Sequence, residues 1–119
     1  MTVVEKTAAG IIERLRAPVR QAQHAPGFIY NSPEHFAREK ENIFMRDWLF
    51  VAHEQELESS GDYLTLRVLG EPTLLTRDNE GKLNAFANVC LHRGVEVATG
   101  RGNLKEFMCP YHGWLYDLE

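Results

Sequence analysis

The stretch from residue 90 to residue 114, CLHRGVEVATGRGNLKEFMCPYHGW, decides how this chain folds. It begins with the loop CLHRG at 90–94 and ends with the loop CPYHGW at 109–114, and each loop carries one cysteine and one histidine. Sixteen residues separate His92 from Cys109, and the polar stretch 100–103 between them, with two glycines, predicts a chain reversal. Such a hairpin would bring both loops to the same end of a sheet.

The two loops together contain four side chains of metal-ligand type: Cys90, His92, Cys109 and His112. A tetrahedral zinc site accepts this donor set, but it usually takes two cysteines from one half and two histidines from the other. Here each loop supplies one of each. That arrangement suits a [2Fe–2S] cluster in which two thiolates hold one iron and two imidazoles hold the other.

The loops C-x-H-R-G and C-P-Y-H-G-W resemble the Rieske domain of ring-hydroxylating oxygenase α subunits. The similarity extends over roughly residues 28–119 and includes the segments 48–53, 61–63 and 88–90. The resemblance implies that Cys90 and Cys109 bind the inner iron, and that His92 and His112 bind the outer, more exposed iron.

Five other loop residues are expected to surround the cluster: Arg93, Gly94, Tyr111, Gly113 and Trp114. The glycines allow close approach of the backbone, whose N–H groups can then reach the sulfurs. Tyr111 and Trp114 are expected to cover the cluster, while Arg93 either caps a carbonyl or faces water. The remaining histidines have no ligand spacing, and we interpret them as surface or packing residues: His24, His35 and His53.

Three subclasses of Rieske protein carry loops of this kind. Respiratory Rieske proteins link their two loops with an extra disulfide, but Val95 and Tyr111 stand at the corresponding places and the chain has only two cysteines. That subclass is excluded. A stand-alone Rieske ferredoxin has about this length and stays an alternative. The Arg-Gly after His92, the Trp after the second His-Gly and an upstream capped helix favour an oxygenase α subunit.

The oxygenase interpretation implies electron transfer from a reductase or ferredoxin to a mononuclear Fe(II). That iron is expected only in the full-length protein, because nothing before Glu119 resembles its domain and the chain alone lacks an oxygenating site. We expect the N-terminal part of an α subunit that forms a homotrimer when complete. Without a disulfide or hydroxyl donors near the sulfurs, the potential should lie low in the Rieske range, roughly −150 mV to slightly above zero.

Composition limits the other possibilities. The chain has 119 residues, a formal net charge of −4 and 44% hydrophobic residues, as expected for one small globular domain. The mild acidity argues against nucleic-acid partners, and no apolar stretch is long enough to cross a membrane. Glu5 and Lys6 interrupt any signal peptide. With two cysteines beside histidines, we expect a cytoplasmic, reducing location.

The pattern along the chain predicts a mostly β fold, a small antiparallel sandwich or barrel with an N-terminal helical extension. Residues 1–30 are expected to form the extension, with a helix at 8–16, and residues 31–119 the Rieske domain. Ser32, Pro33 and Glu34 predict the start of a helix that runs to about Arg46. Strands are expected at 48–53, 64–68, 72–77, 82–89, 104–109 and 114–118.

Overall fold

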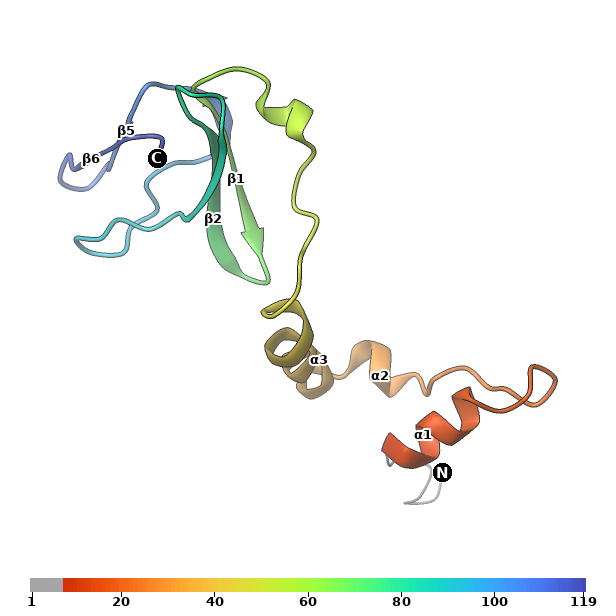
Figure 1. Cartoon of the computed structure of the whole chain (residues 1–119). Helices are drawn as coiled ribbons and strands as arrows, with labels where there is room; N and C mark the ends of the chain where they lie inside the picture. The colour runs from red at the N-terminus through yellow and green to blue at the C-terminus, as the bar shows by residue number, and fades with distance from the viewer. Residues whose placement is uncertain (1–7) are drawn as a thin grey trace. The chain divides into compact units, whose positions relative to one another are not determined.

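The computed structural model describes residues 8–119 and shows an antiparallel, sheet-rich fold that follows a few helices (Figure 1). The chain divides into two compact units between Leu49 and Phe50. Residues 1–7 of the expected extension lie outside the described part. Within residues 8–119, no helix is long and apolar enough to span a bilayer.

The first unit is helical, with α1 at Ala8–Leu15, α2 at Phe28–Asn31, α3 at Pro33–Glu39 and a π-helical turn, η2, at Lys40–Phe44. The predicted cap of α3 is confirmed, because the Ser32 hydroxyl accepts a hydrogen bond of 3.2 Å from the backbone N–H of His35. Phe36 and Phe44 lie on one side, with ring centroids 6.4 Å apart. α3 itself ends at Glu39, and the helical structure continues through η2 to Phe44, close to the predicted end at Arg46.

The second unit contains a four-stranded antiparallel sheet in the order β3-β2-β1-β4 (Figure 1). Its strands are β1 at Asp62–Val68, β2 at Glu71–Arg77, β3 at Leu83–Ala87 and β4 at Arg101–Asn103. Leu69 and Gly70 join β1 to β2 with φ values of 55° and 93°, the conformation of a tight two-residue hairpin. A smaller sheet pairs β5 at Phe107–Met108 with β6 at Leu115–Tyr116.

The prediction of a strand at residues 48–53 is wrong. The segment is irregular, and it leads into a short 3-10 helix, η3, at Glu54–Leu57, whose first turn is capped by the His53 side chain. The Phe50 side chain is 86% exposed. An apolar run becomes a strand only where a free sheet edge accepts its backbone, and within the described residues this run pairs with no strand.

The prediction of a turn at 100–103 is also wrong, because three of the four residues lie in a strand. Arg101–Asn103 form β4, which pairs with the start of β1 in the register Tyr63↔Gly102. Gly102 suits this place because a Cβ there would lie 3.0 Å from the Tyr63 ring. Pairing with β1 therefore overrides the local preference of a polar, glycine-rich stretch. The strands predicted at 104–109 and 114–118 exist but are shorter.

The core of the second unit joins the large sheet to the small one. Leu74 of β2, Ala98, Phe107 of β5 and Leu118 are buried together. The Tyr63 and Phe107 rings meet edge to face at a centroid distance of 5.2 Å. This packing fixes the small sheet, and with it the segment 109–114, relative to the large sheet.

Candidate metal centre

The first cysteine loop has a closed backbone. The N–H of Cys90 donates to the carbonyl of Val95 at 2.7 Å, and the N–H of Gly94 donates back to the carbonyl of Cys90 at 2.8 Å. Gly94 has a φ of 71°, in the left-handed region that a side chain disfavours. The glycine is therefore required by the turn that closes this loop.

The second cysteine loop is closed by the same pair of backbone hydrogen bonds, which we call the closed frame of a loop. The N–H of Cys109 donates to the carbonyl of Trp114 at 2.8 Å, and the N–H of Gly113 donates to the carbonyl of Cys109 at 3.0 Å. Gly113 has a φ of 73°, close to the value of its counterpart. The loops differ in where the histidine falls, two residues after the cysteine in the first loop and three after it in the second.

The four predicted ligands come together as two pairs. Cys90 and Cys109 are 3% and 2% exposed, and neither is in a disulfide. His92 and His112 are exposed, and their ring centroids lie 4.7 Å apart. Within residues 8–119, no three His, Cys, Asp or Glu side chains are grouped closely enough to hold one metal ion. Buried sulfur donors with exposed nitrogen donors fit a cluster whose two irons take different ligands.

Aromatic rings flank the two exposed imidazoles. The Trp114 ring stacks on His92 at a centroid distance of 5.2 Å with an interplanar angle of 4°. The Tyr111 ring lies against His112 at 3.9 Å. Both aromatic side chains are about half exposed, so they shield one side of each imidazole and leave the rest to solvent. Arg93 is also exposed.

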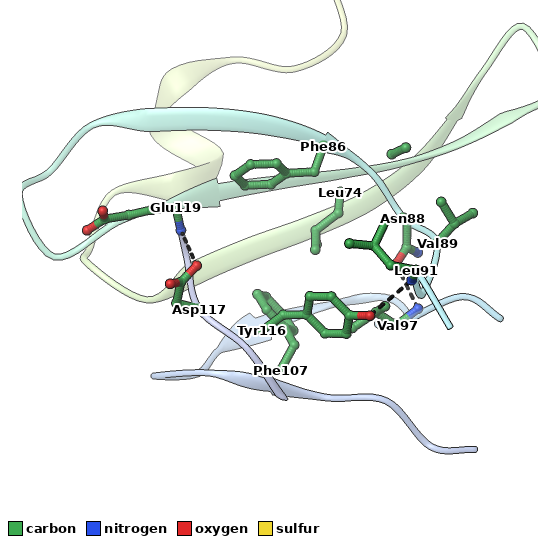
Figure 2. Close-up of a pocket in the computed structure, with 11 residues that line it drawn as sticks. Leu74, Phe86, Asn88, Val89, Leu91, Val97, Phe107, Tyr116, Asp117 and Glu119 are labelled. Carbon is green, nitrogen blue, oxygen red and sulfur yellow. Dashed lines mark hydrogen bonds between the residues drawn. The ribbon is translucent and has the colours of Figure 1, made fainter. Parts of the chain in front are cut away.

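Tyr116 of β6 is a site residue that the sequence analysis missed. Its hydroxyl donates to the Cys90 sulfur at 3.1 Å. The same hydroxyl accepts from the Leu91 backbone N–H at 3.0 Å (Figure 2). The expectation that no hydroxyl group reaches the sulfurs is therefore wrong. The sequence carried only a partial signal, because Tyr116 lies two residues from the buried Leu118 in a predicted strand, which indicates an inward side chain but not a contact with Cys90.

The Tyr116 hydroxyl changes the electrostatics of the nearest thiol. Its hydrogen bond lowers the pKa of Cys90, the backbone N–H groups of His92 and Arg93 and the Cys109 thiol act in the same direction, and burial opposes them. The pKa of Tyr116 is raised, chiefly by the same bond to Cys90. This corner of the site therefore favours negative charge on sulfur.

An apolar cavity of about 290 Å³ lies beside Tyr116 (Figure 2). Leu74, Phe86, Val97 and Phe107 contribute to its walls. A hydrogen bond next to such walls is stronger than the same bond in water, because the local dielectric constant is low. The bond between Tyr116 and Cys90 benefits from this environment.

The other histidines lie elsewhere. His24 is in the exposed loop between α1 and α2, and the His35 imidazole is 3.7 Å from the Glu39 carboxylate one helical turn later. His53 caps η3 through its Nδ1, which accepts from the Gln55 N–H at 3.2 Å.

Comparison with known families identifies the fold. Residues 47–119 match the family model described as the Rieske [2Fe-2S] domain. The chain belongs to this family. A [2Fe–2S] cluster is therefore its cofactor, as expected from the two loops.

Relatives of this Rieske chain are oxygenase components. It is 39% identical over 108 residues to the carnitine monooxygenase oxygenase subunit of Escherichia coli (strain K12), covering 90% of this chain and 29% of that protein. It is 44% identical over 87 residues to the large oxygenase component of the naphthalene 1,2-dioxygenase system of Pseudomonas aeruginosa, covering 72% and 19%. The chain thus spans less than a third of the length of either relative.

A solved structure supports the same relationship. A quaternary ammonium Rieske monooxygenase, described in connection with carnitine oxidation by gut microbiota and inter-subunit electron transfer, superposes with a TM-score of 0.74. The two are 42% identical, over 78% of this chain and 26% of that one. The resemblance to oxygenase α subunits is confirmed, and it supports a role in electron transfer.

Proposed function

We propose that this chain is the electron-transfer part of a Rieske non-haem iron oxygenase, with Cys90 and Cys109 on the inner iron and His92 and His112 on the outer iron. The observation that carries the proposal is the pair of equivalent loops, which bury both sulfurs and expose both imidazoles next to each other. Two ligands of each kind, one pair inside and one outside, are what this cluster needs.

When bound, the cluster stores one electron at a time. The chain's own residues make the added negative charge tolerable. The Tyr116 hydroxyl and the backbone N–H groups of His92 and Arg93 are directed at the Cys90 sulfur, and each stabilises charge there. The two imidazoles are the outermost donors of the site, so they provide the path by which an electron enters or leaves.

In the complete protein, the donor would be a reductase or a ferredoxin and the acceptor a mononuclear Fe(II) held outside these 119 residues. We further propose a homotrimer in which the acceptor belongs to a neighbouring subunit. The oxygenase relatives and the inter-subunit transfer described for the solved monooxygenase support this arrangement. A stand-alone ferredoxin is the alternative.

The test is the metal content of the purified chain. Iron and acid-labile sulfide should each approach two per chain, with thiolate-to-iron absorption in the visible and an electron paramagnetic resonance (EPR) signal after reduction. One zinc without sulfide would overturn the proposal. Cys90→Ser and His92→Ala should lose the cluster. His35→Ala is the matched control, because its imidazole belongs to α3, and it should keep full iron content.

A second measurement separates the oxygenase from the ferredoxin. The reduced chain is mixed with Rieske oxygenases from which their own electron donor has been omitted, and electron transfer is followed by visible absorption. Rapid transfer of the stored electron from the free chain to such a partner would favour the ferredoxin. No transfer, with an intact and reducible cluster, is the result expected of an α-subunit part.

A further inference from the structure

Asn88 is the buried side chain that leads into the first cysteine loop. It follows β3 and is 1% exposed. Its Oδ1 accepts from the backbone N–H groups of Val97 and Ala98, both at 3.0 Å, and its Nδ2 donates to the carbonyl of Ala98 at 2.8 Å. Its own N–H donates to the carbonyl of Pro72 at 2.8 Å. Asn88 and Val97 lie beside the cavity in Figure 2.

These bonds join the two ends of the segment that contains the first loop. Asn88 precedes Cys90 by two residues, and Ala98 follows the closing residue of the loop, Val95, by three. Because Ala98 is 8% exposed, its N–H and C=O have little access to water if the amide is removed. An ion pair between Arg67 and Glu96 also touches the segment, but it is exposed and contributes little.

The second loop is anchored by different residues. The Thr76 hydroxyl donates to the carbonyl of Leu118 at 2.9 Å, and the Asn84 amide donates to the same carbonyl at 3.2 Å. Both bonds hold the chain after β6. The amide of Asn88 makes no bond to this segment, so its effect on the site passes through the first loop.

We propose that Asn88 is a positioning residue whose side-chain amide holds the first ligand loop in its metal-binding shape before any cluster is bound. The inference rests on the proposed function, since it treats Cys90 and His92 as ligands. A loop already closed by its amide loses less conformational freedom when the cluster binds, so binding is tighter and the ligand geometry is fixed.

Hydrogen exchange in the metal-free chain tests the first half of the proposal. The N–H groups of Val97 and Ala98 should be protected, and Asn88→Ala should reduce their protection by about tenfold or more, the effect of losing an ordinary buried hydrogen bond. Asn88→Asp keeps an oxygen for both accepting bonds but places a second carboxylate oxygen against the Ala98 carbonyl, so it should also lose protection. Absence of protection in the unmodified metal-free chain would overturn the proposal.

Cluster retention tests the second half. After reconstitution, the half-life of the cluster under a chelator should shorten about tenfold in Asn88→Ala, with a changed EPR line shape. The control is Leu57→Ala, a cavity variant at a residue 3% exposed on η3. Leu57 and Leu75 line the same cavity, and the Leu75 side chain points to the face of β2 opposite Leu74. Leu57→Ala should therefore destabilise the fold at a place away from the two cysteine loops.

A failure of the Asn88 proposal can be told apart from a failure of the proposed function. If the chain binds no iron, the proposed function is wrong, while the exchange experiment on the metal-free chain still reports on Asn88. If Leu57→Ala shortens cluster lifetime as much as Asn88→Ala at equal loss of stability, Asn88 has only a general structural role. The positioning proposal would then be wrong.

Discussion

Removal of one oxygen atom from Tyr116 should lower the reduction potential of the cluster. Tyr116→Phe deletes the hydroxyl that lies 3.1 Å from the Cys90 sulfur and leaves the ring in the core. A hydrogen bond contributes about 0.5–1.5 kcal/mol with a neutral acceptor and about 1.5–3 kcal/mol with a charged one, so the added electron strengthens this bond by about 1 kcal/mol. For a one-electron couple, that difference corresponds to about 40 mV.

The assay is a redox titration of the reconstituted chain, followed by visible absorption or EPR. Tyr116→Phe should shift the midpoint downward by about 40 mV, with iron content unchanged. Tyr111→Phe is the matched control, since its ring lies against His112 and no hydrogen bond joins it to a sulfur. The Tyr111 variant should keep the original midpoint. An unchanged or higher potential in Tyr116→Phe would refute the role given to the hydroxyl.

Three further predictions concern stability. Phe107→Ala removes a ring that is 2% exposed and packs on Tyr63, so denaturant unfolding should show a loss of about 3–5 kcal/mol. The pKa of Asp78 is lowered from its usual value of 3.8, chiefly by the hydrogen bond from Asn84. The ionised carboxylate therefore stabilises the fold above pH 3.8, and this stabilisation is lost as the pH falls through the lowered pKa. Asp78→Asn should weaken the acid dependence of thermal unfolding. Gly113→Ala meets no atom within 4 Å but forces a side chain to a φ of 73°, so it should cost about 1–2 kcal/mol, and a much larger cost would mean that the loop is packed more tightly than described.

Features set by neighbouring residues were predictable from the sequence. The start of α3 depends on Ser32 and Pro33 alone, and the β2–β3 turn depends on Asp78, whose carboxylate accepts from the N–H groups of Glu80 and Lys82. The start of α3 and the strands on either side of this turn were predicted correctly, because the stabilising bonds join residues a few positions apart.

Features set by distant partners were not predictable in the same way. The apolar run at 48–53 has strand character and forms no strand, while the polar stretch Arg101–Asn103 pairs with β1 some forty residues earlier. The four proposed ligand residues were recognisable because metal chemistry restricts which residue types can stand there. Tyr116 was not, because its contact with Cys90 runs from β6 to the first loop and a tyrosine in a strand has many ordinary uses.

The closed frames of the two loops divide this part of the chain into places that can and cannot change length. Inside 90–95 and 109–114, each hydrogen bond joins residues at a fixed separation, so one added residue would break both bonds of a loop. Between β4 and β5, the exposed residues Lys105 and Glu106 form a bend outside both frames. Doubling the length of a flexible connection costs only about 0.6 kcal/mol of loop-closure free energy. A peptide tag or reporter inserted between Lys105 and Glu106 should therefore leave the cluster in place, and this is where the domain can be labelled.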